Sequence, residues 1–145
     1  MSTLRFPYAE FRFPTTPAFG RQSRFRPFIP VSLAHAGHSE EVYALIDSGA
    51  DTTVFSNEVG ELLGLKVRTG VRETFVGTSG RAQVVYYHDL MLGFRSGNEK
   101  VEYESRVGFS RLPADVAGLL GQIGLFDHFT VTLSQPRLEV ILRTD

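Results

Sequence analysis

The chain of 145 residues contains no cysteine, which excludes disulfides, thiolate catalysis and cysteine-ligated zinc. No run of about 18 apolar residues occurs, so we expect no membrane-spanning helix. The formal net charge is only -1 at pH 7, and this balance gives no indication of binding to nucleic acid or anionic membranes. Arg5, Arg12 and several prolines interrupt the N-terminal segment, which therefore lacks the apolar centre of a secretory signal. We expect a cytoplasmic protein without a metal or cofactor.

The first thirty residues differ in composition from the rest. They contain six of the twelve phenylalanines, five of the seven prolines and five arginines, against the single acidic residue Glu10. Dense proline disfavours helices and central strands. We therefore expect an N-terminal arm over residues 1–28 and one domain over residues 29–145. The arm either lays its aromatic side chains on the domain surface, since aromatics are usually buried, or is a removable or regulatory segment that occupies a groove.

From residue 29 the pattern becomes rich in β-strands. Alternating apolar residues predict strands at 29–33 and 42–46, joined as a hairpin by a turn at 36–38. A short helix should follow a cap at Ser56 or Asn57 and end at Gly64. Further predicted elements are strands at 71–76, 82–87, 90–94, 101–104, 106–109, 129–133 and 138–142, and a second short helix near 122–128.

Two segments of the sequence together suggest a catalytic site. An apolar strand ends at Asp47, where Ser48 offers a hydroxyl beside the acid and Gly49 allows close backbone approach. About seventy residues later, the apolar segment Leu119–Gly121 precedes the second expected helix. Asp-Ser-Gly by itself is also common in ordinary turns. The argument therefore depends on the order of these two segments, with the glycine-containing segment Gly77–Gly80 between them.

This order resembles the retropepsin family of aspartic proteases. Its members have an apolar-apolar-Asp-Thr/Ser-Gly-Ala segment, a glycine-rich flap, and an apolar-apolar-Gly segment that leads into a helix. Residues 118–133 are also similar to the retroviral-like protease domain of DNA-damage-inducible ubiquitin-shuttle proteins and to small bacterial relatives. The resemblance covers roughly residues 29–143. It implies an all-β, closed-barrel-like retropepsin fold with one or two short helices.

The resemblance also implies a homodimer. Peptide hydrolysis by this route needs two carboxylates that share one proton, and the chain holds a single Asp-Ser-Gly triplet. A second copy would supply the other Asp47 across a two-fold axis. The implied function is an aspartic endopeptidase that hydrolyses extended polypeptides. The alternative is a catalytically inactive dimer that binds peptides or proteins, because a fold does not guarantee activity.

The family pattern assigns a role to each matching residue. Asp47 of both chains would hold and activate the attacking water, without an acyl-enzyme. Ser48 would bond across the dimer, and Gly49 would contact a carboxylate and the substrate. The substrate-binding residues would be Ala50 and Asp51 together with a flap made of Gly77, Thr78, Ser79 and Gly80. The residues supporting the Asp47 loop would be Leu119, Leu120 and Gly121.

Two residues depart from the family pattern. Ser48 replaces the commoner Thr, so the hydroxyl is kept while a packing methyl is lost. Gln122 stands where the viral enzymes carry an Arg that pairs with the acid matching Asp51. This second departure leaves the orientation of Asp51, and part of the expected dimer stability, open.

Overall fold

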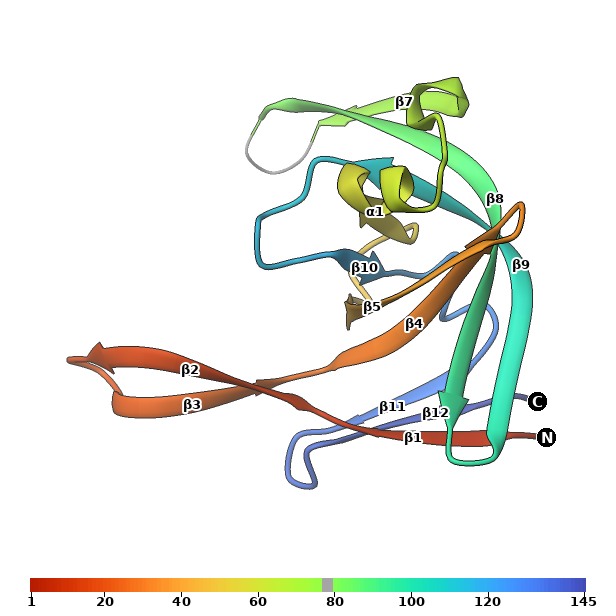
Figure 1. The fold of residues 1–145 in the computed structure, drawn as a ribbon. Helices are drawn as coiled ribbons and strands as arrows, with labels where there is room; N and C mark the ends of the chain where they lie inside the picture. The colour runs from red at the N-terminus through yellow and green to blue at the C-terminus, as the bar shows by residue number, and fades with distance from the viewer. Residues whose placement is uncertain (77–79) are drawn as a thin grey trace.

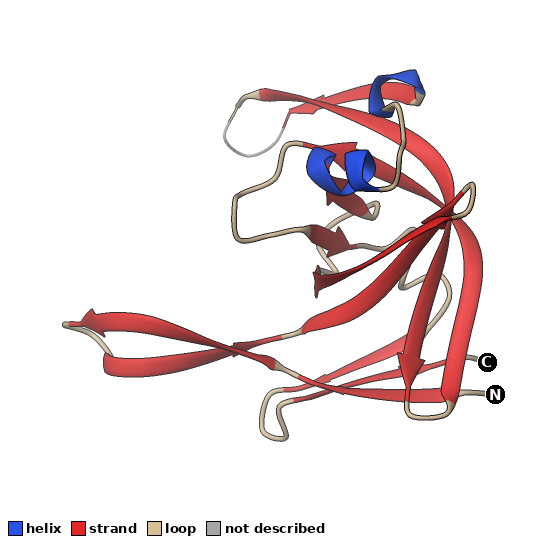
Figure 2. Ribbon diagram, viewed as in Figure 1, coloured by secondary structure: helices blue, strands red, loops and turns tan. Residues whose placement is uncertain are grey.

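The computed structural model describes residues 1–76 and 80–145, and β-strands dominate it (Figures 1 and 2). One α-helix, α1 (Asn57–Leu62), and one 3-10 turn, η1 (Val67–Thr69), are present in this part of the chain. None of its helices is long and apolar enough to cross a membrane. The strands are β1 (Thr3–Pro7), β2 (Ala9–Thr16), β3 (Gly20–Arg26), β4 (Phe28–His35), β5 (His38–Ile46), β6 (Val54–Ser56), β7 (Val71–Val76), β8 (Ala82–Ser96), β9 (Glu99–Ser110), β10 (Gly118–Leu120), β11 (Thr130–Ser134) and β12 (Glu139–Arg143).

A closed barrel forms the body of the molecule. Its strands follow the order β4, β5, β10, β6, β9 and β8, and β8 also pairs with β4, which closes the ring. The short strand β10 runs parallel to β5 and antiparallel to β6. Phe55, Phe94 and Phe109 are among the largest fully buried side chains and fill the interior. The expected all-β, closed-barrel-like retropepsin fold is confirmed.

Several predicted elements merge in the structure. The hairpin of strands 29–33 and 42–46 is confirmed as β4 and β5, with Gly37 at a φ of 84° in the turn. The strands expected at 82–87 and 90–94 form one strand, β8, and those at 101–104 and 106–109 form β9. Their register is continuous from Tyr86–Phe109 to Ser96–Glu99. Unbroken cross-strand pairing therefore carries both strands through positions where the local pattern is interrupted.

The helix expected near 122–128 is wrong, because this segment forms turns. The N–H of Leu125 donates to the carbonyl oxygen of Gly121 at 3.2 Å, whereas the N–H of Asp127 donates to that of Gln122 at 2.9 Å. These bonds span four and five residues respectively, so no single helical repeat is established. Gly124 has a φ of 113°, which no right-handed helix contains.

The N-terminal residues take two different positions. Strand β1 pairs with β12, and its Leu4 and Phe6 belong to the buried core. Strands β2 and β3 instead form a hairpin that leaves the barrel and projects from it (Figure 1). We call this hairpin, Ala9–Arg26, the arm. The interpretation that residues 1–28 lay their aromatic side chains on the domain therefore holds in part: Phe6 and Phe25 pack in or against the core, whereas the outer part of the hairpin projects from the barrel. The domain boundary at residue 28 stays a prediction.

Phe6→Ala should destabilise the protein by about 3–5 kcal/mol, the usual result of removing a buried phenylalanine ring. The reason is that Phe6 is only 4% exposed and packs in the central core. Thermal or urea unfolding measures the effect, and Leu62→Ala is the control, because Leu62 is 62% exposed. Equal stabilities for the two variants would show that β1 is not part of the cooperative core.

Candidate active site

Asp47 lies directly after β5, where the strand turns away from the barrel. Its backbone N–H donates to the carbonyl oxygen of Leu120 at 3.0 Å. Its side-chain Oδ1 accepts a hydrogen bond from the N–H of Gly49 at 2.9 Å. The N–H of Ala50 also donates to the carbonyl oxygen of Asp47 at 3.2 Å. A carboxylate that bonds the backbone two residues later is typical of an Asx turn, and here the turn orients the acid.

Strand β10 and the residues directly after it support the Asp47 loop through backbone hydrogen bonds. The strand lies between β5 and β6, and Leu119 pairs with Leu45 on one side and Val54 on the other. Just after β10, the N–H of Gln122 donates to the carbonyl oxygen of Ala50 at 2.9 Å, and that of Ile123 donates to the carbonyl oxygen of Asp51 at 3.0 Å. Backbone hydrogen bonds therefore join two segments far apart in sequence and restrain the loop.

Thr53 is a supporting residue that the sequence analysis missed. Its side chain is fully buried. The Oγ1 accepts a hydrogen bond from the N–H of Gly121 at 3.0 Å and donates to the carbonyl oxygen of Ile123 at 2.9 Å. A buried polar side chain that is fully bonded rigidifies its surroundings. The family motif ends before this position, and no local pattern marks a threonine whose partners come from the other segment.

Gly121 allows the two segments to approach closely. A Cβ atom at this position would collide with the carbonyl oxygen of Thr52 and would lie 2.7 Å from that of Ala50. Both atoms belong to the backbone of the Asp47 loop, which cannot move aside as a side chain could. The structure therefore requires glycine here, because only glycine lacks a Cβ.

A groove of about 560 Å³ opens beside the loop, and we call it the central groove. Its lining includes Gly49, Ala50 and Asp51, the residues of the loop that follows Asp47. Tyr87 of β8 also lines the groove, and its hydroxyl is 3.0 Å from the Oγ1 of Thr52. The lining residues are Gly49, Ala50, Asp51, Thr52, Val54, Glu73, Phe75, Gln83, Tyr87, Ser110, Arg111, Leu112, Pro113 and Leu119.

Residues 30–122, about two thirds of the chain, match the family model described as aspartyl protease. The chain belongs to the aspartyl protease family. A retropepsin-like aspartic protease from Rickettsia conorii has a similar solved structure, with 13% identity and a TM-score of 0.56 over 92% of this chain and 98% of that one. Another is the retroviral protease-like domain of Ddi1 from Leishmania major, with 18% identity and a TM-score of 0.50 over 77% and 82%. No curated protein matches significantly.

In this aspartyl protease chain the two departures from the family pattern lie next to each other. The Nε2 of Gln122 donates to the carbonyl oxygen of Ser48 at 3.0 Å. Gln122 therefore bonds the backbone of the Asp47 loop at Ser48. Ser48 and Asp51 are both exposed, so their side chains are accessible to a ligand or to another chain.

Part of the expected flap can be located. Gly77, Thr78 and Ser79 lie outside the described residues, whereas Gly80 is exposed and has a φ of 76°. The strands on either side of this segment, β7 and β8, pair antiparallel from Val71–Tyr87 to Val76–Ala82. Strand β7 contributes Glu73 and Phe75 to the central groove. The flap role of these residues stays a prediction.

Tyr103 stabilises the turns that follow Gly121. Its hydroxyl donates to the carbonyl oxygen of Gly124 at 2.6 Å, and its ring stacks on His128 with a centroid distance of 3.7 Å. Burial raises the pKa of Tyr103, and the charge of nearby Asp127 raises it further. The phenol therefore keeps its proton at all physiological pH values and remains a donor. Over residues 1–76 and 80–145, no group of three or more His, Asp or Glu side chains is arranged to hold a metal.

Proposed function

We propose that the protein is an aspartic endopeptidase that acts as a homodimer, with a water molecule activated between the Asp47 side chains of two copies. The observation that carries this proposal is the position of Asp47 in a chain of the aspartyl protease family. The acid is held by hydrogen bonds with Leu120 and Gly49, and the loop residues that follow it line the central groove. It belongs to the single Asp-Ser-Gly triplet in the sequence.

The chemistry explains why one copy would not suffice. Water attack on a peptide bond requires one group that accepts a proton and another that donates one. Two adjacent carboxylates that share a proton provide both, because like charges at that distance cannot both be ionised. The Oδ1 of Asp47 is bonded to Gly49, which leaves Oδ2 to face a water and the second acid. In a two-fold dimer both carboxylates would come from the same loop.

The central groove supports an extended polypeptide as the substrate. Its apolar lining residues include Phe75, Tyr87 and Leu119, which suits apolar side chains on either side of the cleaved bond. Strand β7 pairs with β8 and is the last strand in its sheet order, so its other edge offers backbone groups. An extended peptide can bind such an edge as an added strand. Ala50 and Asp51 would bind its backbone from the opposite side of the groove, under Gly80 and the rest of the flap.

Mixing wild-type and Asp47→Asn chains tests whether two copies share one site. With a ninefold excess of the variant and free exchange of subunits, about nine in ten wild-type chains would pair with a variant copy. We expect the rate of cleavage of a labelled unfolded protein, per wild-type chain, to fall to about a tenth. Sedimentation of the mixture checks that the variant chains enter dimers.

An unchanged rate per wild-type chain would contradict the shared site and would place catalysis within one copy. A wild-type dimer without any turnover from acidic to neutral pH would favour the alternative function. The protein would then be an inactive retropepsin-like dimer that binds peptides through the same groove. The control for this mixture uses Asp89→Asn in place of Asp47→Asn as the chain added in excess, because Asp89 is exposed on β8 and lies outside the groove. Because this variant keeps its own activity, the rate per total chain in a mixture with a ninefold excess of it should equal the rate per chain of the wild type alone.

A further inference from the structure

The arm is a two-stranded hairpin whose base meets the barrel, where Phe25 packs against the core and the ring centroids of Phe11 and Phe28 lie 5.1 Å apart. Strands β2 and β3 pair with each other and with no other strand in the described structure. The eight residues of β2 would extend about 25 Å at the usual rise per residue. A two-stranded hairpin is marginally stable in water unless a further surface covers one of its faces. The arm therefore has the properties of an element that packs against something outside the isolated chain.

One face of the arm carries the residue types that dominate protein interfaces. Phe11 and Phe13 alternate with exposed residues on β2, and Arg24 and Arg26 lie on the paired strand. The guanidinium of Arg24 lies 4.4 Å from the centroid of the Phe13 ring, and that of Arg26 lies 5.0 Å from it. Aromatic residues and arginine are enriched in interface hot spots. We call these four residues the Phe-Arg face.

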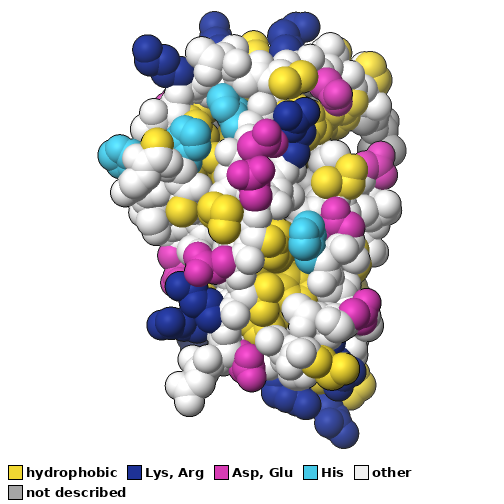
Figure 3. Space-filling view, turned by 90° about the vertical axis from the view of Figure 1, so that its right-hand side faces the viewer, with side chains coloured by type: hydrophobic (Ala, Val, Ile, Leu, Met, Phe, Trp, Pro, Cys, Tyr) yellow, Lys and Arg dark blue, Asp and Glu magenta, His cyan; other side chains and the backbone are white. Residues whose placement is uncertain are grey.

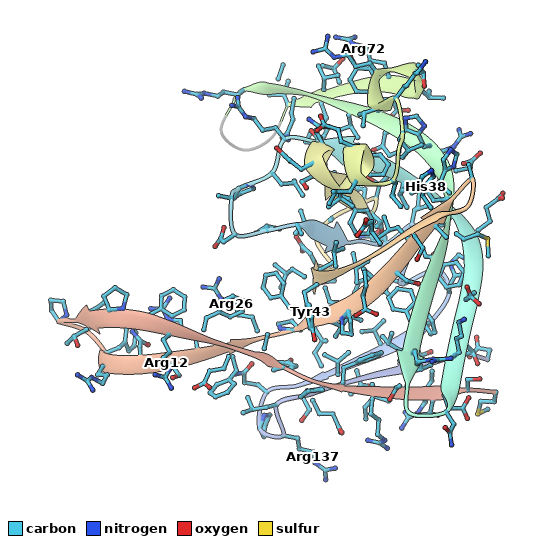
Figure 4. All side chains as sticks on the ribbon, in the orientation of Figure 1. Arg12, Arg26, His38, Tyr43, Arg72 and Arg137 are labelled. Carbon is cyan, nitrogen blue, oxygen red and sulfur yellow. The ribbon has the colours of Figure 1, made fainter. Side chains whose placement is uncertain are left out.

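The arm leaves the barrel on the side where β5 ends, directly before Asp47 (Figure 1). In Figure 1 the arm projects toward the same side as the loop between β9 and β10. Figure 4 shows Arg26 on the side of the arm that faces this loop and Arg12 on the opposite side. On the far side of the molecule, acidic, basic and apolar side chains are interspersed (Figure 3). The Phe-Arg face thus borders the space that the partner of Asp47 would occupy.

The base of the arm offers a surface of complementary charge. A groove of about 690 Å³, which we call the base groove, lies between the arm and the β9–β10 loop. Glu10, Glu58 and Asp115 line it, together with Phe11, Phe28 and Tyr43, which is 59% exposed. The arm carries Arg12, Arg21, Arg24 and Arg26 against the single acid Glu10. Opposite charges of this kind favour contact between copies related by a two-fold axis, since each copy presents both surfaces.

We infer that the arm is a dimerisation clasp: the Phe-Arg face of each copy packs against the base groove of a second copy of this chain. The inference rests on the proposed homodimer and adds the surface that holds it together. The contact is isologous, so each dimer contains it twice. It places the two barrels with their Asp47 loops on the shared side, because the arm and the loop face the same way.

Charge reversal on the two faces of the arm tests the clasp. Arg24→Glu/Arg26→Glu changes the Phe-Arg face, and Arg12→Glu/Arg21→Glu makes the same charge change on exposed positions of the same strands. Sedimentation of the full chain measures the dimer dissociation constant. We expect the first variant to raise it about tenfold or more, as for a charge pair in an interface, and the second to raise it less than about threefold. Circular dichroism verifies that both variants are folded.

A charge swap separates contact with the partner from contact within one chain. Glu58→Lys/Asp115→Lys should weaken the homodimer as Arg24→Glu/Arg26→Glu does. Mixing the two variants should restore dimerisation, since each heterodimer then pairs opposite charges at both contacts. No restoration, equal effects of the two arm variants, or a monomeric wild type would each overturn the clasp. If the arm variants dimerise like the wild type and the dimer still cleaves substrate, the clasp is wrong and the protease proposal is retained. If the arm variants lose dimerisation but the wild-type dimer cleaves no substrate, the protease proposal is wrong and the clasp is retained.

Discussion

The Asp47→Asn variant is expected to lose cleavage of an unfolded protein by roughly 10²–10⁴-fold, the usual contribution of a positioned acid or base. The amide has nearly the same shape as the carboxylate, so its oxygen can still accept the hydrogen bond that Gly49 donates at 2.9 Å. It can neither take up nor release the shared proton. The loss should therefore appear in turnover, while folding and dimerisation remain as in the wild type.

The measurement compares initial rates from acidic to neutral pH, with thermal unfolding and sedimentation run on the same samples. Asp89→Asn is the control, because Asp89 is exposed and pairs with Arg106 on the surface. An exposed pair of this kind contributes little to stability, so the control should keep its activity. Equal rates for wild type and Asp47→Asn at every pH would remove Asp47 from the mechanism.

Gly121→Ala should lower activity by about 100-fold, the usual effect of displacing a catalytic group by about 1 Å. The added methyl would collide with the Thr52 carbonyl oxygen and lie 2.7 Å from that of Ala50. Only movement of the Asp47 loop or of β10 can relieve these contacts, and either movement alters the bond between Asp47 and Leu120. Overpacking of a tightly packed site also costs about 1–3 kcal/mol of stability.

Gly97→Ala distinguishes a damaged site from a general loss of stability. Gly97 lies in the turn between β8 and β9, has a φ of 59° and has open space around its Cα. An alanine there should cost about 1 kcal/mol through backbone strain and leave the Asp47 loop unchanged. If both glycine variants retain the same activity at a temperature where both are folded, the close approach at Gly121 is not what positions Asp47.

The sequence was sufficient for local features whose signals lie within a few residues. The β4–β5 hairpin, α1 and the closing pair of strands follow from alternation, turn residues and the glycine that ends the helix, although the side chain of Ser56 at the N-cap makes no capping hydrogen bond. Long-range pairing altered the elements whose local pattern was ambiguous. Two pairs of expected strands merged into β8 and β9, and the expected helix at 122–128 became a set of turns around Gly124. In each case hydrogen bonds between distant segments outweighed local propensity.

The arm shows the same division between local composition and tertiary context. Its aromatic and arginine content was visible in the sequence, which led to an expectation of an extended segment. The sequence could not show that Leu4 and Phe6 enter the core while the next strands project away. Burial depends on which surface a strand meets, and that surface is built here by β12, at the other end of the chain.

For the site, the sequence by itself identified Asp47 as the candidate acid and showed that one chain offers a single Asp-Ser-Gly triplet. Only the tertiary structure decided how that acid is held. Leu120, Gly121 and Thr53 act on the Asp47 loop through hydrogen bonds and close contacts between segments about seventy residues apart. Such contacts form only after the barrel closes, because strand β10 must lie between β5 and β6 before its backbone can reach the loop.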